Sequence, residues 1–326
     1  MQDFGHGFFM SPETYAELSK ASSALGRLEP AHESVPDMFA ALRAPRLVLI
    51  DVRSNLTGDA AAARASFAAA HVPGARFLSF EAVFTSPRTA ESGRHPWPAA
   101  SHVREALVAF GVLPEDRLVF VDEGAMTFAA RALLCARLAG YPDCAVLEGG
   151  LTRWRALGLP TETGLVEALA EKRERAAAFA PAAGPCVIGL DDVVRNLDER
   201  TFKLLDARPH TRWLGEEKSD IALDGAAGRI PGSLNRPASE NVDAFGRMKS
   251  PERLRLEFET LLAKYKAKPA DIVQSCGSGV AACLNVLAMD RAGLLSADEA
   301  RLYAGSWSEW ARHPALPRES GPEADT

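Results

Sequence analysis

The chain has 326 residues, of which 47% are hydrophobic and 25% charged, and its formal net charge is −6. This length predicts two globular domains, each long enough to bury a core of its own. The acidic balance without a basic stripe argues against a nucleic-acid partner, and no apolar stretch approaches the ~18–20 residues that a membrane-spanning helix needs.

The first half of the chain alternates short apolar strands with loops and helices. A helix predicted over about 128–139 ends at Gly140, a residue suited to the left-handed conformation at a helix C-terminus. Four segments mark this half in order, namely LVLIDVRS (47–54), HVPGA (71–75), RLVFVD (117–122) and LEGGLTRW (147–154).

The second half repeats these segments in the same order. They are FKLLDARP (202–209), RIPGS (229–233), DIVQSC (271–276) and LYAGSWSEW (302–310). Asp51 and Asp206 lie 155 residues apart, and the other pairs have nearly the same offset, which indicates a duplication. Strands that alternate with helices predict an α/β fold. We therefore expect two tandem domains, each a mainly parallel sheet with helices on both faces.

We place the N-terminal domain at 33–159, a linker at 160–187 and the C-terminal domain at 188–317. The linker is predicted from its composition, since it contains PTETG, the charged run EKRER and APAAGP. The polar tail after Pro317 is expected to be disordered.

The stretch DIVQSCGSGVAACLNVLAMD carries the most chemical information. A strand is predicted to end at Ser275, the loop CGSG follows, and a helix begins near Val280. Glycines let several backbone N–H groups turn towards one small volume, and the N-terminus of the following helix adds positive potential. Such a cradle favours a thiolate, so we predict that Cys276 is a nucleophile.

A lone cysteine is most often a small buried hydrophobic residue. The glycine-rich loop sets Cys276 apart, whereas Cys283 lies within the helix and indicates core packing. Cys135, Cys144 and Cys186 lack such a loop and are assigned structural roles. The odd cysteine count and irregular spacing argue against a disulfide framework and a zinc site. We therefore expect a reducing cytoplasm, no metal and no cofactor.

Other cysteine chemistries fit the sequence less well. Cysteine-dependent phosphatases place an arginine six residues after the nucleophile, where this chain has Ala282. A Cys–His hydrolase needs a base, and the only histidines of the second half, His210 and His313, lie in no obvious motif. A redox pair of Cys276 and Cys283 would need Cα atoms ~4.4–6.8 Å apart, which is unfavourable across a helix start.

Four motifs of the second half belong together: IPG (230–232), NRPASENVDAFGRMKSPERLRLEF (235–258), CGSGV (276–280) and GSWSEW (305–310). They resemble the catalytic half of bacterial two-domain rhodanese-type sulfurtransferases, the family of 3-mercaptopyruvate and thiosulfate sulfurtransferases. HVPGA, the strand before Asp122 and LEGGLTRW resemble that family's cysteine-free N-terminal domain. The resemblance implies two tandem rhodanese-like domains with the active site between them.

The resemblance also implies the reaction. Cys276 would take sulfane sulfur from a small-molecule donor, form a persulfide, and pass the sulfur to a thiol, such as thioredoxin or a small thiol, or to cyanide. Members that use thiosulfate carry cations in the cysteine loop, whereas this loop carries none and is similar to the mercaptopyruvate type. The loop residues that would contact the donor are Gly277, Ser278, Gly279, Val280 and Ala281.

Further donor contacts follow from the same resemblance. Arg212 occupies the place of the arginine that grips the donor carboxylate, although a solvated surface role is the alternative. Ser278 is a candidate for stabilising an enolate and relaying a proton, or else a loop cap. Arg229 replaces the usual histidine of Gly-His-Ile-Pro-Gly and is a candidate for a second carboxylate-binding arginine. His71 is a candidate for the cleft, or else a strand cap.

Two departures bear on the donor. Ala281 stands where the family usually has threonine, and the segment before Gly-Arg-Ile-Pro-Gly lacks the second arginine. A thiosulfate-preferring rhodanese and a persulfide carrier or binding module without turnover therefore stay as alternatives. Asp122 occupies the place of the first domain's nucleophile, which predicts one persulfide per chain.

Overall fold

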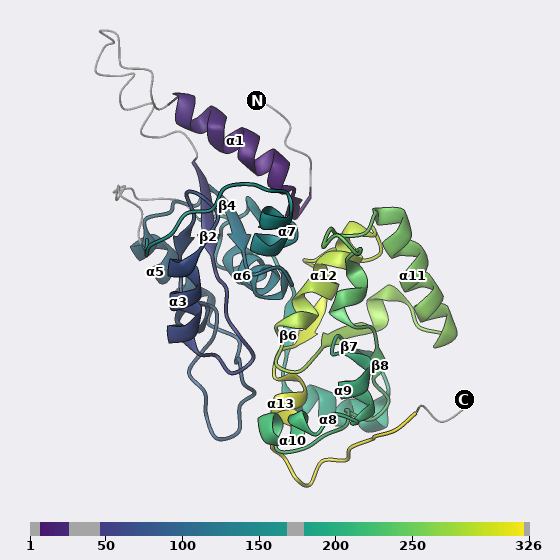
Figure 1. Ribbon diagram of the computed structural model, residues 1–326. Coiled ribbons are helices and arrows are strands. Elements are labelled where there is room, and N and C mark those ends of the chain that lie inside the picture. Colours follow the sequence, from purple (N-terminus) through teal and green to yellow (C-terminus); the bar gives the residue numbers. More distant parts are fainter. Residues whose placement is uncertain (1–6, 26–45, 168–178, 323–326) are drawn as a thin grey trace.

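The computed structural model describes residues 7–25, 46–167 and 179–322, and it contains two domains (Figure 1). Each domain is built on a five-stranded sheet, in the order β1-β5-β4-β2-β3 in the first and β6-β10-β9-β7-β8 in the second. All the ladders within these sheets are parallel. The predicted α/β class with two tandem parallel sheets is confirmed.

The first sheet lies between two groups of helices. Its strands are β1 (Phe9–Met10), β2 (Leu47–Asp51), β3 (Arg76–Phe77), β4 (Arg117–Val121) and β5 (Cys144–Leu147). The helices are α1 (Pro12–Leu25), α3 (Ala60–Ala69), α4 (Phe80–Val83), α5 (Ala100–Phe110), α6 (Thr127–Leu138) and α7 (Gly150–Ala156). Alternate residues of β4 show the two faces: Phe120 packs with α4, α5 and α6, and Val119 packs with α3 and α7.

The second domain repeats this arrangement. Its strands are β6 (Cys186–Ile188), β7 (Lys203–Asp206), β8 (Leu234–Asn235), β9 (Ile272–Ser275) and β10 (Arg301–Tyr303). The helices are α8 (Leu190–Glu199), α9 (His210–Leu214), α10 (Ser219–Asp224), α11 (Pro251–Lys264), α12 (Ala281–Arg291) and α13 (Ser306–Trp310), with 3-10 turns at Ala238–Asn241 and Pro269–Asp271. On β9, Ile272 faces α11 and α12, and Val273 faces α8 and α13.

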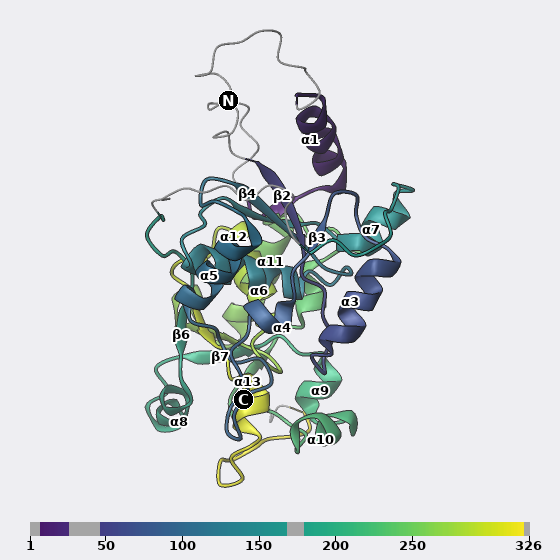
Figure 2. The same ribbon diagram turned by 90° about the vertical axis from the view of Figure 1, so that its left-hand side faces the viewer.

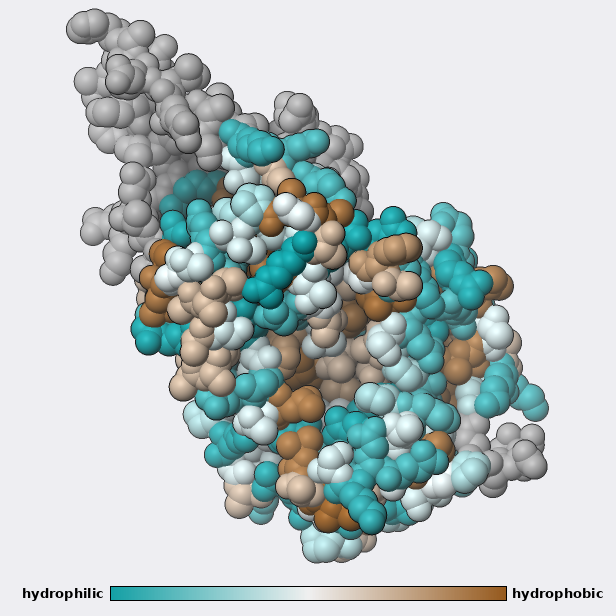
Figure 3. All heavy atoms as spheres, in the orientation of Figure 1, coloured by the Kyte–Doolittle hydropathy of each residue, from teal (hydrophilic) through white to brown (hydrophobic). Residues whose placement is uncertain are grey.

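The two domains share one hydrophobic core. A single cluster of buried residues runs from α5 and α6 of the first domain to α11 and α12 of the second. Helices α6 and α12 lie side by side at the junction (Figures 1 and 2), and hydrophobic residues line the recess there (Figure 3). The domains are therefore docked through buried apolar surface rather than only tethered.

The sheets extend beyond the domain bounds expected from composition. The strand β1 precedes residue 33, and β6 begins at Cys186, inside the segment 160–187. The start of that segment packs on the first domain, where Glu162 bridges to His71. Residues 168–178 lie outside the described part of the chain.

The tail after Pro317 differs from the expectation of disorder. The backbones of Glu319 and Arg229 bond to each other, and the carbonyl of Gly321 accepts a hydrogen bond from the Arg229 side chain at 2.7 Å. These contacts order residues 318–322 against the second domain. Across the described ranges, no helix combines the length and the apolar character needed to cross a membrane.

The duplication extends to side-chain geometry. In the first domain the guanidinium of Arg53 pairs with Asp51 at 2.6 Å, and in the second Arg208 pairs with Asp206 at 2.8 Å. All four side chains are buried. The pair ties the carboxyl end of the strand to the loop that follows it, and in parallel sheets ligands bind at this edge.

Candidate active site

The loop that carries Cys276 joins β9 to α12 at the carboxyl edge of the second sheet. Three hydrogen bonds from the GSWSEW segment fix it. The Cys276 N–H donates to Ser306 Oγ at 3.1 Å, the Cys276 carbonyl accepts from the Trp307 N–H at 3.1 Å, and the Gly277 carbonyl accepts from the Ser308 N–H at 2.8 Å. The Cys276 loop and the GSWSEW segment therefore form one hydrogen-bonded unit.

Gly279 is required by the geometry of the loop. Its φ of +74° is in the left-handed region, and a Cβ there would lie 2.4 Å from the carbonyl oxygen of Ala304. Its own carbonyl accepts a hydrogen bond from Arg131 of the first domain at 3.1 Å. Val280 is the N-cap residue of α12 and Ala281 is the first residue of the helix, in agreement with the predicted helix start near Val280.

Ser278 lies in a line of polar residues that crosses the domain boundary. Its Oγ is 2.8 Å from Nδ1 of His95, and Nε2 of His95 is 3.3 Å from the carboxylate of Glu81. Ser54 donates to the same carboxylate at 2.9 Å. Ser278 and His95 are buried. The serine, imidazole and carboxylate are arranged as a proton relay.

The surroundings of His95 favour the neutral form of its imidazole. Burial lowers the pKa of His95, although the neighbouring Glu81 carboxylate opposes the shift. Burial acts to raise the pKa of Glu81, but its contacts with His95 and Ser54 hold it below the usual value. With its proton on Nε2, a neutral His95 presents the lone pair of Nδ1 to Ser278 and can accept a proton.

His95 and Glu81 were missed by the sequence reasoning. The sequence offers only His210 and His313 as histidines of the second half, whereas the histidine that reaches the loop comes from the first. The available signal was the segment GRHPWP (93–98), where a histidine is fixed between glycine and prolines in a loop. In Figures 1 and 2 the connection between α4 and α5 extends towards α13, and the Arg94 N–H donates to Ser308 at 2.9 Å.

Arg212 is buried on α9 beside a network of charges. Its Nε is 2.5 Å from Asp220, and its Nη2 is 3.8 Å from Asp224. Asp220 also lies 3.5 Å from Arg208, the arginine of the Asp-x-Arg strand end. The pKa of Arg208 is raised, because Asp206, Asp220 and Cys276 outweigh the effect of burial. The network lies beside the Cys276 loop, since Cδ of Arg208 is 3.7 Å from the position that a Cβ on Gly277 would take.

Arg229 does not have the contacts expected of a donor-binding residue. Its guanidinium pairs with Glu319 at 3.3 Å, donates to the carbonyl of Gly321, and lies over the ring of Trp213 at 4.0 Å. The ordered C-terminal segment supplies these partners. These contacts join Arg229 to the C-terminal segment and to Trp213, which fits a structural role.

His71 is likewise enclosed by its own domain. Its ring stacks on Phe67 at 4.0 Å, its Nδ1 is 3.0 Å from the Phe67 carbonyl, and its Nε2 is 3.8 Å from Glu162. These contacts tie the end of α3 to the segment that leaves the first domain. They correspond to the structural alternative and not to a cleft residue.

The loop equivalent to the Cys276 loop in the first domain is filled by its own side chain. The carboxylate of Asp122 accepts N–H hydrogen bonds at 2.9 to 3.3 Å, from Gly124, Met126, Phe128 and Ala129. The loop of the first domain therefore binds an anionic group at the position that corresponds to Cys276. In the first domain the anion is a fixed carboxylate, which cannot carry sulfur.

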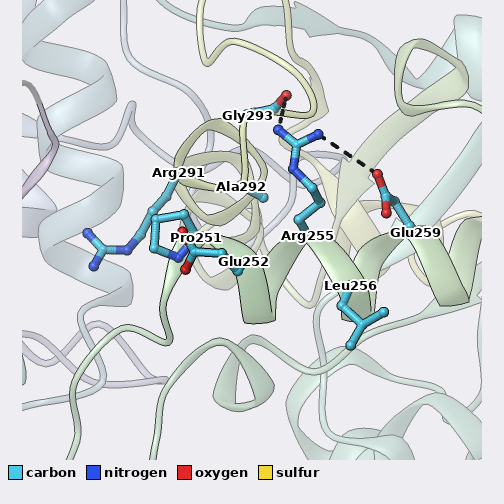
Figure 4. A pocket seen from close by; sticks show the side chains of 8 residues that line it. All are labelled: Pro251, Glu252, Arg255, Leu256, Glu259, Arg291, Ala292 and Gly293. Atoms are coloured by element: carbon cyan, nitrogen blue, oxygen red, sulfur yellow. Dashed lines mark hydrogen bonds and ion pairs between the residues drawn. The ribbon is translucent and has the colours of Figure 1, made fainter.

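A separate pocket of about 310 Å³ lies between α11 and α12 (Figure 4). Arg255 reaches from it to the carbonyl of Gly293 at 3.2 Å and to Glu259 at 3.9 Å, and Arg291 donates to the Lys249 carbonyl. Its lining contains no cysteine, serine or histidine. Among the described residues there is also no cluster of three or more side chains suited to a metal ion.

Comparison with known proteins places this geometry in a family. The model of the rhodanese-like domain matches residues 35–157 and 190–313. A probable 3-mercaptopyruvate sulfurtransferase of Pseudomonas aeruginosa is 35% identical over 289 residues, covering 87% of this chain and 96% of that protein. The 3-mercaptopyruvate sulfurtransferase of Escherichia coli is 35% identical over 280 residues, covering 84% and 92%.

A solved structure agrees with these relatives. The crystal structure of SseA from Escherichia coli, described by its rhodanese fold and as a 3-mercaptopyruvate sulfotransferase, matches with a TM-score of 0.67 and 28% identity. The match covers 92% of this chain and 99% of that one. The chain therefore belongs to the rhodanese family, with two tandem rhodanese-like domains. It is an enzyme of the sulfurtransferase class.

Proposed function

We propose that the protein moves sulfane sulfur from 3-mercaptopyruvate, through a persulfide on Cys276, to a thiol or to cyanide. The observation that carries the proposal is the Ser278–His95–Glu81 line, which ends at an uncharged Cys276 loop. A donor that releases an enolate needs such a proton relay, and the loop itself offers no cation for a compact dianion.

The first step forms one bond and breaks another. The thiolate of Cys276 attacks the donor sulfur, the carbon–sulfur bond breaks, and its electron pair moves onto the neighbouring carbonyl as the enolate of pyruvate. Backbone N–H groups of the glycine loop are suited to binding the developing negative charge. The burial of Cys276, which is 2% exposed, keeps water from competing with the transfer.

The relay transfers the proton of the donor thiol to the enolate carbon. Ser278 takes the proton from the donor thiol and passes its own to Nδ1 of His95, and Glu81 stabilises the imidazolium. The proton then returns through Ser278 to the enolate carbon, which gives pyruvate. No external acid or base is needed, because the proton lost by sulfur is the proton gained by carbon.

Arg212 is the residue we assign to the donor carboxylate. Its Nη2 has no hydrogen-bond partner among the described residues, although the side chain is buried. A guanidinium matches a planar carboxylate with two parallel hydrogen bonds. Loop residues from Gly277 to Ala281 complete the donor contacts in this proposal.

The proposal also covers the sulfur acceptor and the cellular compartment. We assign thioredoxin, a small thiol or cyanide as acceptor, since a persulfide transfers its outer sulfur to a soft nucleophile. We assign the cytoplasm because the chain's five cysteines are all free thiols, which suits a reducing compartment.

Steady-state kinetics with 3-mercaptopyruvate and thiosulfate side by side test this function. We expect the higher kcat/KM with mercaptopyruvate. Arg212→Ala should lower that value by about one to two powers of ten, the loss of a charge-assisted contact of ~1.5–3 kcal/mol. Arg212→Lys should restore only part, because an ammonium cannot make both parallel bonds.

Two results would decide for the alternatives. A wild-type preference for thiosulfate, with Arg212→Ala harming both donors equally, would favour a thiosulfate rhodanese. The buried arginines near the loop are the observation on which that alternative rests. Persulfide loading without turnover on any acceptor would favour a carrier.

A further inference from the structure

The loop residues Gly93–His95 of the first domain are wedged into the second domain. A Cβ on Gly93 would lie 2.6 Å from the carbonyl oxygen of Gly305, so only glycine fits. The Arg94 N–H donates to Ser308 Oγ at 2.9 Å, and His95 contacts Ser278. Because the neighbouring residues Gly93 and His95 both contact the second domain, the position of the Arg94 backbone in the site is fixed.

The Arg94 guanidinium lies beside the nucleophile loop. Its Nη2 is 3.1 Å from the position that a Cβ on Gly277 would take, and the side chain is 4% exposed. Its Nη1 pairs with Asp224, while its Nε has no hydrogen-bond partner among the described residues. A cation is therefore present next to Cys276, although the loop sequence contains none.

Arg94 and Arg212 share one carboxylate. Asp224 contacts Arg94 through Oδ1 and lies 3.8 Å from Arg212 Nη2 through Oδ2. In this cluster the buried donors that lack a hydrogen bond within the described chain are Arg94 Nε, Arg208 Nη1 and Arg212 Nη2. Three arginines that each keep one buried N–H without a hydrogen bond favour an anionic ligand with more than one oxygen.

The charges of the cluster limit the charge of that ligand. The arginines are balanced by three buried aspartates, Asp206, Asp220 and Asp224. A thiolate on Cys276 then makes the site negative. The site is therefore better suited to a monoanion than to a dianion, because each further negative charge is repelled in a buried environment of low dielectric constant.

We propose that Arg94, supplied by the first domain, is a specificity-determining residue that binds the anionic group of the sulfur donor together with Arg212, and that Asp224 sets the preference for a monoanionic donor. This inference rests on the proposed sulfur transfer at Cys276. It gives the first domain, which lacks a catalytic cysteine, a direct part in donor recognition, beyond its contribution of His95.

The test compares R94Q, D224N and the control R312Q with three donors: 3-mercaptopyruvate, its uncharged carboxamide and thiosulfate. Arg312 also bridges the domains, donating to the Ala90 carbonyl at 3.2 Å, but it is solvent-exposed. R94Q should raise the KM for mercaptopyruvate about 10–100-fold with a smaller change in kcat, and should leave the carboxamide reaction nearly unchanged. R312Q should resemble wild type with all three donors.

D224N removes one negative charge from the cluster. It should raise the ratio of thiosulfate to mercaptopyruvate kcat/KM by about tenfold or more, because the dianion gains most from the lost repulsion. An unchanged or lowered ratio would overturn the role of Asp224.

Equal losses by R94Q with the charged and the uncharged donor would mean that Arg94 only supports the fold, and would overturn its role in specificity. A wrong assignment of the proposed function would give a different result, because it would be seen in the kinetics of the wild-type enzyme. If wild type used thiosulfate alone, the mercaptopyruvate assignment would fall, and Arg94 would be judged by whether R94Q raises the KM for thiosulfate.

Discussion

Cys276 differs from the other buried cysteines in its surroundings rather than in its exposure. Burial raises the pKa of Cys135 to about 11 and raises the pKa of Cys144 and of Cys283 as well. These thiols pack in the core and stay protonated at neutral pH. Cys276 lies at the end of β9, where its backbone is held by hydrogen bonds to Ser306 and Trp307.

Sulfur loading should therefore be confined to one residue. Mass spectrometry after donor treatment should find one added sulfur per chain, on the peptide that contains Cys276. Cys276→Ser should load none, because a hydroxyl cannot hold a persulfide, and Cys283→Ser should still load. A labile sulfur on Cys135 or Cys144 at equal occupancy would contradict the assignment.

The pH dependence of turnover should report His95. His95 must be neutral to accept the proton of Ser278, so kcat falls as the pH falls through the pKa of His95. Burial lowers that pKa, which places the acid limb of the kcat profile below ~6.5, the ordinary value for histidine. The measurement is kcat with mercaptopyruvate across the acid range.

Glu81→Gln is the matched variant for this profile. The Glu81 carboxylate opposes the lowering of the His95 pKa, so its removal should move the acid limb to still lower pH. An acid limb that moves to higher pH in Glu81→Gln would exclude the relay. An unchanged acid limb and an unchanged kcat in Ser278→Ala would exclude it as well.

At the scale of elements, the two strand–loop–helix units show what the duplication kept. β4 and β9 are both followed by a short loop and then a helix. The first domain fills its loop with the Asp122 carboxylate, and the second carries the thiol of Cys276 at the corresponding position. One unit stabilises the fold, and the other performs chemistry.

Gly279 should be the least replaceable residue of the catalytic loop. Gly279→Ala combines a left-handed backbone, which costs ~1–2 kcal/mol, with a clash against the Ala304 carbonyl at 2.4 Å. Gly158→Ala is the control, since its φ is +69° with nothing within 4 Å of the added Cβ. Urea unfolding should show the larger loss for Gly279→Ala, accompanied by loss of turnover. Equal losses would mean that the loop can move aside.

At the scale of the whole molecule, Arg131 on α6 joins the domains at the active site. It is completely buried, and its guanidinium donates to the carbonyls of Gly279, Phe84, His95 and Pro96 while lying over Trp97 at 4.2 Å. One side chain therefore holds both the nucleophile loop and the backbone of the relay histidine.

Arg131→Met should destabilise the protein by about 3 kcal/mol or more, because the carbonyls around it lose a charged donor in a buried environment. It should also lower kcat more than it raises KM, since it misplaces His95 against Ser278. Free energies of unfolding from urea titration and steady-state kinetics measure the two effects.

Arg137→Met provides the comparison, because Arg137 lies on the same helix and also crosses to the second domain. It pairs with the half-exposed Asp298 at 2.9 Å, so its loss should cost at most about 1 kcal/mol and leave kcat unchanged. If the two variants behaved alike, Arg131 would be no more than one of many interface contacts.

The parts of this protein that could be read from its sequence depend on near neighbours. Alternating apolar runs determine the strands, and the glycines after Ser275 determine the Cys276 loop, because each needs only a few adjacent residues. The repeat then fixes the two-domain architecture. Even Gly279, whose Cβ would meet Ala304, lies in a motif that shows a tight turn.

The relay and the charges of the site were decided by tertiary structure. Ser278 and His95 are 183 residues apart, and Arg94 and Asp224 are 130 apart, so their contacts exist only once the two domains dock. Arg229 shows the converse, since its charge is neutralised by a C-terminal segment whose composition suggested disorder. A side chain's partner is chosen by competition among all groups that folding brings within reach, and no local pattern records that competition.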